Sequence, residues 1–322
     1  MASAVVSPHS SLNTPLTQSR AEVVQRCASG IQTTLKDWTA PRVLLFDDYV
    51  VKFNQEDRCN EADTQAFVYE AFKNSPNAPR IPEVYDCFTW DHWQYFVMER
   101  VHLPTVQHWL MDAVSEADQQ SRFETACQLI ANALRSLFTL SPPPDAEIGL
   151  IKGAYAHTLR ADVCARSGCA IHPFFGSFTA PFRYTGAPAL ERHINRSLTY
   201  RPGTAPRLEV SMSDEPLVMV QSEIAPDKFL IDPETQQLTM IDFGHVSALP
   251  HSFVSYTLHV CGDKFTAEIA KYLDWERSNN RRPMAAAARI YMLSCSKRFG
   301  LDKDGYPQKP APRPSQPLCT RS

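Results

Sequence analysis

One stretch of the chain, residues 217–246, limits the possible folds more than any other part of the sequence. It places short β-rich runs between tight polar loops, and strands are expected at 217–220, 229–232 and 238–241. The last of these strands ends in Asp242, which is followed by Phe243 and Gly244. A carboxylate held at the end of a buried strand suits a magnesium-bound phosphate chain, and the glycine allows the backbone to pass close to a ligand.

The segment 42–99 predicts a small antiparallel sheet that contains one helix. Two pairs of β-rich runs are each separated by a short turn, at 43–46 with 49–53 and at 84–89 with 94–99. Between the pairs, Asn60 is placed to cap a helix that extends to about Lys73. Another helix is expected before the first strand, at 19–28.

From Glu99 onward the sequence is mainly helical. Apolar residues recur at helical spacing in four regions, 105–117, 121–140, about 189–199 and 251–300. The expected fold is therefore α+β with two lobes, a small N-lobe over 18–100 and a larger, mainly helical C-lobe over 101–305. Residues 1–17 and the proline-rich stretch 306–322 lack periodicity, so both are expected to be disordered tails.

The charge and hydropathy of the chain argue against nucleic acid and membranes as binding partners. The chain carries 32 basic and 35 acidic residues, and this net charge of −3 provides no general attraction to nucleic acid or to a membrane surface. No apolar run approaches the roughly 18–20 residues that span a bilayer. The first residues lack a basic region followed by an apolar core, so we expect no secretory signal and a cytoplasmic protein. The nine cysteines are expected to be buried free thiols.

Other catalytic chemistries find no support in the sequence. The ten histidines show no metal-ligand spacing, and neither a hydrolase nucleophile elbow nor a Walker loop is present. Glycine is absent between Gly30 and Gly149, so the glycine-rich phosphate lid of protein kinases cannot form in that region.

In order and spacing, these pieces resemble the aminoglycoside phosphotransferase and choline kinase-like family. The resemblance covers about 40–300 and looks most like the fungal members, whose catalytic segment reads His-Gly-Asp-Ile-Ala-Pro-Arg-Asn-Phe. The same nine positions here, 221–229, read Gln-Ser-Glu-Ile-Ala-Pro-Asp-Lys-Phe. The resemblance implies a bilobal protein-kinase-like fold that uses ATP and Mg²⁺ to phosphorylate a hydroxyl group of a small molecule.

The resemblance assigns two charged residues of the N-lobe to the ATP phosphates. Lys52, on the strand Val50-Val-Lys-Phe53, corresponds to the lysine that contacts the phosphates. Glu61, on the following helix, corresponds to the glutamate that pairs with this lysine, and Glu70 on the same helix is the alternative.

The resemblance also implies which residues bind the adenine base and which turn covers the phosphates. Met98, Glu99 and Val101 would form the hinge between the lobes, whose backbone binds the base. Related small-molecule kinases without the glycine-rich lid cover the phosphates with a hairpin turn, which corresponds here to Asp47 and Asp48. Asp242 would be the metal ligand.

Three positions of the catalytic segment depart from the family pattern and make the catalytic loop degenerate. Glu223 replaces the catalytic aspartate, which keeps a carboxylate but displaces its oxygens by about 1 Å, enough to cost on the order of a hundredfold in rate. Lys228 replaces the metal-binding asparagine, and an ammonium group cannot ligate a cation, although it can neutralise phosphate charge. Gln221 replaces the histidine, a milder change because both side chains form neutral hydrogen bonds.

Two functions from different classes remain open. The first is ATP- and Mg²⁺-dependent phosphoryl transfer to a small hydroxyl compound, with Glu223 as a weakened base. The second is a pseudokinase, a binding or scaffold module that has lost transfer and whose protein partner the sequence does not name. The convergence of Lys52, Glu61, Glu223 and Asp242 on one place is the observation on which both depend.

Overall fold

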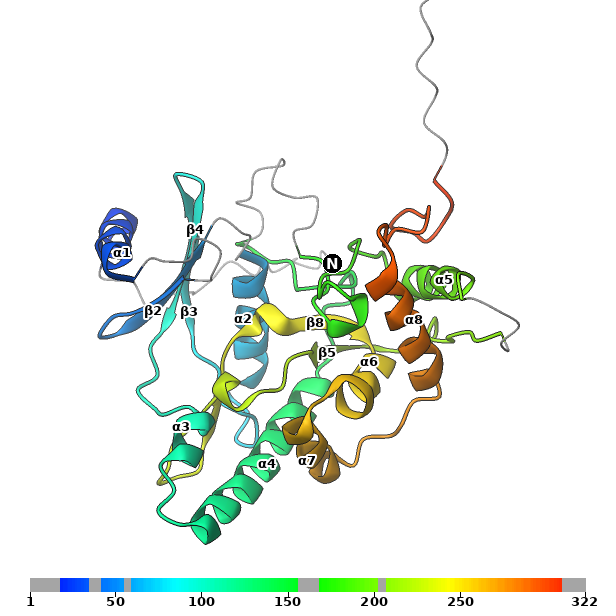
Figure 1. Ribbon diagram of the computed structural model, residues 1–322. Coiled ribbons are helices and arrows are strands. Elements are labelled where there is room, and N and C mark those ends of the chain that lie inside the picture. Colours follow the sequence, from blue (N-terminus) through cyan, green and yellow to red (C-terminus); the bar gives the residue numbers. More distant parts are fainter. Residues whose placement is uncertain (1–17, 35–41, 55–58, 156–167, 202–206, 309–322) are drawn as a thin grey trace, which may run out of the picture.

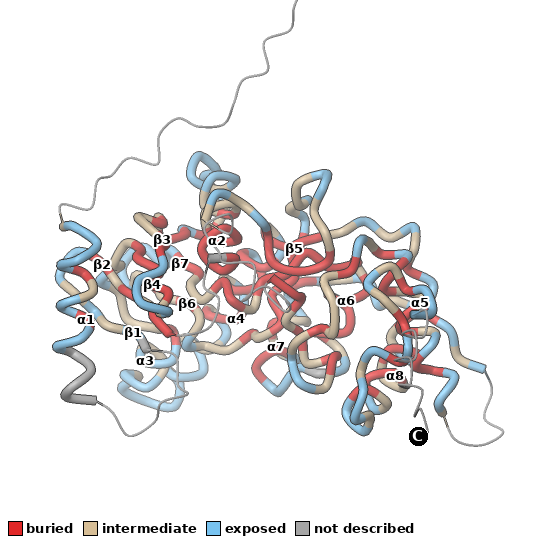
Figure 2. Tube along the Cα trace, turned by 90° about the horizontal axis from the view of Figure 1, so that it is seen from above, coloured by how far each residue is buried: buried red, intermediate tan, exposed pale blue. Residues whose placement is uncertain are grey.

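The computed structural model of the chain describes residues 18–34, 42–54, 59–155, 168–201 and 207–308. A small sheet with its helices lies beside a larger, mainly helical part (Figure 1). The α+β, two-lobed architecture expected from the sequence is confirmed. Buried residues continue from one lobe into the other (Figure 2), and Val68 and Ile81 belong to the same apolar cluster as the core of the C-lobe.

The N-lobe sheet has four antiparallel strands in the order β1-β2-β4-β3. The strands are β1 (Arg42–Leu45), β2 (Tyr49–Asn54), β3 (Val84–Trp90) and β4 (Trp93–Glu99). Successive side chains of a strand point to opposite faces of a sheet. Val51 and Phe53 of β2 therefore share one buried face, while Lys52 lies on the other face with Val50.

A helix covers each face of this sheet. α1 (Arg20–Thr34) packs Val23 and Cys27 against the face that carries Val51, and α2 (Cys59–Phe72) packs Ala62 against the opposite face. The described part of the N-lobe thus has two helices, and α1 covers the apolar face of β2 that α2 leaves open. α2 already begins at Cys59, so Asn60 lies inside the helix rather than at its cap.

The turn between β1 and β2 does not lie over the phosphate site, where it was expected from the sequence. The backbone carbonyl of Asp47 contacts Nε2 of His102 at 2.8 Å, and the carbonyl of Asp48 accepts the N–H of Arg100 at 3.3 Å. Both partners follow the end of β4. Because β2 and β4 are antiparallel, the start of β2 must lie beside the end of β4. The turn therefore packs on the segment joining the lobes, and the prediction that it covers the phosphates is wrong.

Helices are the longest regular elements in the described part of the C-lobe. They are α3 (Val106–Met111), α4 (Glu116–Phe138), η2 (Pro173–Phe175), α5 (Ala187–Leu198), α6 (Ser252–Tyr256), the π-helix η5 (Thr257–Cys261), α7 (Lys264–Leu273) and α8 (Arg281–Leu293). The side chains of Thr105 and Ser115 cap α3 and α4. The first helix is thus shorter and the second starts earlier than the sequence predicted, because apolar spacing does not locate a capping hydroxyl.

Two short antiparallel strand pairs lie in the described part of the C-lobe. β5 (Leu217–Gln221) pairs with β8 (Val246–Pro250), and β6 (Phe229–Ile231) pairs with β7 (Leu238–Met240). Two short 3₁₀ turns, η3 (Pro226–Lys228) and η4 (Phe243–His245), connect them. β8 was not predicted as a strand. Its pairing with β5 joins residues far apart in the chain, such as Gln221 and Val246, which are 25 positions apart.

The ends of the chain lie largely outside the described residues. Residues 1–17 and 309–322, which were expected to be disordered tails, are both in this group. The first part of the expected C-terminal tail is folded, because Pro307 pairs with Leu301 and the N–H of Gln308 donates to Gly300 at 2.9 Å. Within the described residues, no helix combines the length and the apolar character needed to cross a membrane.

A buried histidine lies in the C-lobe core. Nδ1 of His172 accepts the N–H of Phe174 at 3.0 Å, so Nε2 carries the proton toward the hydroxyl of Thr257 at 2.9 Å. Burial lowers the pKa of His172 to about 3, because the charged ring would lose its hydration.

We expect this histidine to make the free energy of unfolding depend on pH. Its folded-state pKa lies below the unfolded value of about 6.5, so on acidification the unfolded chain binds the proton first. The stability that the neutral ring contributes is present above about pH 6.5 and falls by up to about 1.4 kcal/mol per pH unit toward pH 3. His172→Asn keeps an acceptor for Phe174 and removes the titration. Urea unfolding at pH 7 and pH 5 should show a smaller loss in the variant, and equal losses would contradict the assignment.

Candidate functional site

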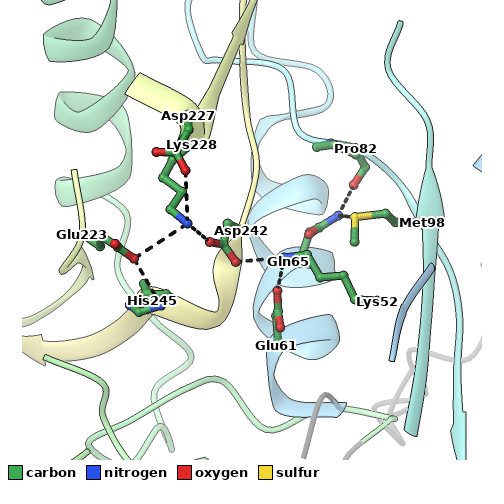
Figure 3. A network of polar contacts seen from close by, with 10 residues as sticks. All are labelled: Lys52, Glu61, Gln65, Pro82, Met98, Glu223, Asp227, Lys228, Asp242 and His245. Atoms are coloured by element: carbon green, nitrogen blue, oxygen red, sulfur yellow. Dashed lines mark hydrogen bonds and ion pairs between the residues drawn. The ribbon is translucent and has the colours of Figure 1, made fainter. Parts of the chain in front are cut away.

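Three charged side chains from distant parts of the chain meet between the lobes (Figure 3). Nζ of Lys52 on β2 lies 2.7 Å from Oε1 of Glu61 on α2 and 2.8 Å from Oδ1 of Asp242, which follows β7. The side chains of Lys52, Glu61 and Asp242 are 13%, 2% and 21% exposed. One lysine therefore connects the N-lobe helix to the C-lobe through two short, largely buried ion pairs.

Glu61 reaches this position because a glycine leaves room for it. The residue lies in the first turn of α2, on the side that faces the C-lobe segment η4. A Cβ on Gly244 would come within 3.3 Å of the Glu61 carboxylate, tighter than an ordinary contact. The glycine after Asp242 and Phe243 thus admits Glu61, whereas the sequence suggested that it admits a ligand. Glu70, the alternative partner of Lys52, instead pairs with Lys73 at the surface.

Asp242 is aimed at Lys52 by a left-handed turn. Its backbone has φ 69° and ψ 63°, a conformation that aspartate adopts more readily than most residues. The next side chain, Phe243, is buried in the C-lobe core and anchors the turn. The strand end and the buried ring together define where the carboxylate lies.

A second ammonium group binds the other oxygen of Asp242. Nζ of Lys228, on η3, lies 2.5 Å from Oδ2 of Asp242 and 3.8 Å from Oε2 of Glu223. Both carboxylate oxygens of Asp242 therefore contact a lysine, Oδ1 that of β2 and Oδ2 that of the catalytic segment (Figure 3).

These contacts keep all three groups charged. Burial alone would raise the pKa of Asp242, but the charges of Lys52 and Lys228 outweigh it and hold that pKa well below its usual range. Burial alone would lower the pKa of Lys52, yet Glu61 and Asp242 raise it. The pKa of Lys228 is likewise raised, since its bond to Asp242 and the nearby carboxylates together exceed the effect of burial.

Glu223 lies at the open side of this network. Its Oε2 is 3.3 Å from Nε2 of His245, and its side chain is 43% exposed. The main chain of His245 is held in place because its carbonyl accepts the N–H of Ser222 at 3.0 Å. Glu223 is therefore a carboxylate that an incoming molecule can reach, next to an imidazole that can orient it.

Glu223, Asp242 and His245 are the residues that could bind a divalent cation at this site. One ligand atom each of Glu223, Asp242 and His245 lies within 4.8 Å of the others, a spacing that a cation could bridge. Lys228 already contacts Asp242 there, and an ammonium group offers no lone pair to a metal. Its charge also opposes a cation at the same place. The residues present therefore suit the ammonium group of Lys228 and do not fit Mg²⁺.

The predicted hinge residues lie at the end of β4. Met98 is opposite Val50, two residues from the pair of Lys52 with Phe96, so it shares the face of Lys52. Its sulfur accepts the side-chain N–H of Gln65 at 3.6 Å. Glu99 forms an ion pair with Arg80. The N–H of Val101 has no hydrogen-bond partner among the described residues.

The structure thus brings the predicted charged residues to one place and adds others. Lys52, Glu61, Glu223, Lys228 and Asp242 form one connected network, with the hinge on the adjoining strand. Sequence reasoning missed two residues, Gln65 and His245. Gln65 lies four residues after Glu61 and so on the same helical face, a signal that was present. His245 gave no such signal, because its approach to Glu223 depends on η4.

The order of the elements, together with the lysine–glutamate pair of the N-lobe and the aspartate after β7, is the arrangement expected for the protein-kinase-like fold. No protein-family model matches the sequence, and no curated protein matches it.

Solved structures with a similar course of the chain are found. An aminoglycoside phosphotransferase of type APH(4)-Ia is 15% identical, with 85% of this chain and 88% of that chain covered and a TM-score of 0.42. An aminoglycoside 2′-phosphotransferase in complex with GDP is 11% identical, with 85% and 87% covered and a TM-score of 0.43. Spectinomycin phosphotransferase, in complex with ADP and spectinomycin, is 8% identical, with 80% and 79% covered and a TM-score of 0.41.

Proposed function

We propose that the protein binds a nucleoside triphosphate between its lobes without a metal ion, and that it transfers the phosphoryl group slowly or not at all. The observation that carries the proposal is the double contact of Asp242 with Lys52 and Lys228. In kinases of this fold the corresponding aspartate binds the cation that neutralises the phosphates. Here an ammonium group of the chain itself supplies positive charge at that carboxylate.

Both lysines retain donors for a ligand. An ammonium group has three N–H donors. Lys52 uses two of them, on Glu61 and Asp242, so one remains for a phosphate oxygen. Lys228 makes one hydrogen bond, to Asp242, and its 3.8 Å separation from Glu223 is too long for another. The base would stack beside Met98, with the N–H of Val101 as its donor.

The same geometry explains why transfer should be weak. Mg²⁺ carries two charges and holds several oxygens in a defined octahedral arrangement, which orients the phosphate for in-line attack. An ammonium group carries one charge and imposes no such arrangement. Replacing Mg²⁺ by an ammonium group therefore reduces catalysis more than nucleotide binding. Catalysis depends on the position of the reacting atoms to within about 1 Å.

A thermal-shift titration tests the proposal. We expect ATP at a hundredfold excess over its dissociation constant to stabilise the protein by about 2.7 kcal/mol, with the same shift in EDTA as in Mg²⁺. AMP, which lacks the β- and γ-phosphates, should give a smaller shift. Stabilisation that requires Mg²⁺, or no stabilisation by ATP in either buffer, would contradict metal-independent binding.

A second candidate is slow phosphoryl transfer to a hydroxyl of a small molecule in the cytoplasm, as the family resemblance implies. The contact of Glu223 with His245 favours it, because an accessible, oriented carboxylate can act as a general base. Glu223 would accept the hydroxyl proton, the hydroxyl oxygen would form a bond to the γ-phosphorus, and the bond to the leaving ADP oxygen would break. Without the transfer activity, the protein is a pseudokinase whose output is nucleotide-dependent binding.

A further inference from the structure

One segment of the C-lobe, residues 148–155, contacts α2 beside Glu61; we call it the connecting segment. The side-chain oxygen of Thr64 accepts the N–H of Ile151 at 2.9 Å. Oδ1 of Asp63 accepts the N–H of Tyr155 at 3.0 Å. Asp63 and Thr64 are both almost completely buried, at 4% and 0% exposed, so the bond to Thr64 is buried and the bond to Asp63 is partly buried.

A glycine allows this close approach. A Cβ on Gly153 would lie 2.5 Å from Oδ1 of Asp63, a distance that real Cβ contacts essentially never show. The backbone of Gly153 lies outside the left-handed region, so the restriction on this position comes from Asp63 and not from the main chain. Beyond it, the ring of Tyr155 packs against the apolar cluster that contains Ala62.

The other end of the connecting segment is fixed to the strand that follows the site. Gly149 and Ala248 of β8 exchange two backbone hydrogen bonds, at 3.1 and 2.6 Å. β8 begins directly after His245. The loop after α2 is also tied to the C-lobe, because Arg80 accepts from Met240 at 2.9 Å and donates to Leu238 at 2.8 Å. Both ends of α2 are thus connected to the elements that hold Asp242.

We propose that the connecting segment holds α2 in place, so that Asp63, Thr64 and Gly153 are positioning residues for the Lys52–Glu61 pair. α2 then has no second position in which Glu61 leaves Lys52, and the phosphate site exists before a nucleotide arrives. The consequence for nucleotide affinity rests on the proposed function, whereas the restraint on α2 does not.

Gly153→Ala tests the restraint, with Gly186→Ala as the matched control. The added Cβ would displace the connecting segment from Asp63, while a Cβ on Gly186 meets only the ring of Pro188 at an ordinary 3.6 Å. In the nucleotide-free protein, we expect hydrogen exchange at the amides of residues 60–66 to become about tenfold faster in Gly153→Ala and to stay unchanged in the control. The dissociation constant for ATP should rise about tenfold in Gly153→Ala alone.

A second pair of variants separates positioning from general loss of stability. Thr64→Val removes the acceptor for Ile151, and Thr64→Ser retains it. We expect faster exchange and weaker ATP binding in Thr64→Val, with both restored in Thr64→Ser. Unchanged exchange at α2 in Gly153→Ala and in Thr64→Val would overturn the proposal. Faster exchange in a protein whose wild type binds no ATP would support the restraint and overturn the proposed nucleotide function instead.

Discussion

Replacing Lys228 by asparagine is expected to make ATP binding depend on Mg²⁺. The substitution removes the ammonium group from Oδ2 of Asp242 and puts an amide oxygen, a ligand that Mg²⁺ accepts, in its place. In EDTA the variant should bind ATP about tenfold or more weakly than the wild type, because a charge-assisted contact to the phosphates is lost. In Mg²⁺ the affinity should recover.

The same thermal-shift titration with ATP, in EDTA and in Mg²⁺, measures this metal dependence. Lys303→Asn is the control. Lys303 is exposed, and its substitution removes the same charge outside the network of Lys52, Asp242 and Lys228. Adding Glu223→Asp to Lys228→Asn restores the family's carboxylate length as well, so the double variant should hydrolyse ATP at least tenfold faster than the wild type. If Lys228→Asn binds ATP equally in Mg²⁺ and in EDTA, the ammonium group does not stand in for a metal.

Replacing Lys52 by methionine is expected to cause the largest loss of stability among single changes at the site. Glu61 is almost fully buried and would lose the Lys52 ammonium group, while Asp242 would still contact Lys228. Removing one member of a buried ion pair costs about 3–5 kcal/mol, because the buried charge that remains loses a nearby opposite charge. The free energy of unfolding in urea measures this loss, and ATP binding should be abolished with it.

Two further variants show whether the buried pair is the cause. Lys73→Met removes a lysine from the exposed pair with Glu70, whose side chains are 39% and 52% exposed, and should leave the free energy of unfolding nearly unchanged, because water screens such a pair. Lys52→Met combined with Glu61→Gln removes both charges of the buried pair and should be more stable than Lys52→Met alone. Equal losses for Lys52→Met and Lys73→Met would show that burial of the pair has no energetic consequence.

Much of the site was predictable because its residues lie in regular elements. Lys52 lies on a strand that the sequence predicted, and Glu61 lies on the helix that the sequence predicted to follow it. Asp242 was marked by its position at the end of a strand. These predictions depend on short-range periodicity, which a sequence displays directly.

The errors arose where position depends on a distant partner. The Asp47–Asp48 turn was placed over the phosphates, yet antiparallel pairing of β2 with β4 puts it on the hinge. The strand β8 was missed because only its pairing with β5 makes it a strand. His245 was missed because a turn, and no periodic pattern, brings it to Glu223.

By itself, the sequence predicted the two-lobed α+β fold and the lysine, glutamate and aspartate that meet between the lobes, and it placed Lys228 in the segment that leads to them. Only the tertiary structure decided that Lys228 contacts Asp242 rather than Glu223, with separations of 2.5 and 3.8 Å. It alone showed that α2 is tied to the C-lobe through Asp63 and Thr64. The physical reason is that an ammonium group on a flexible stem can reach several carboxylates, and packing of residues far apart in the chain selects one of them.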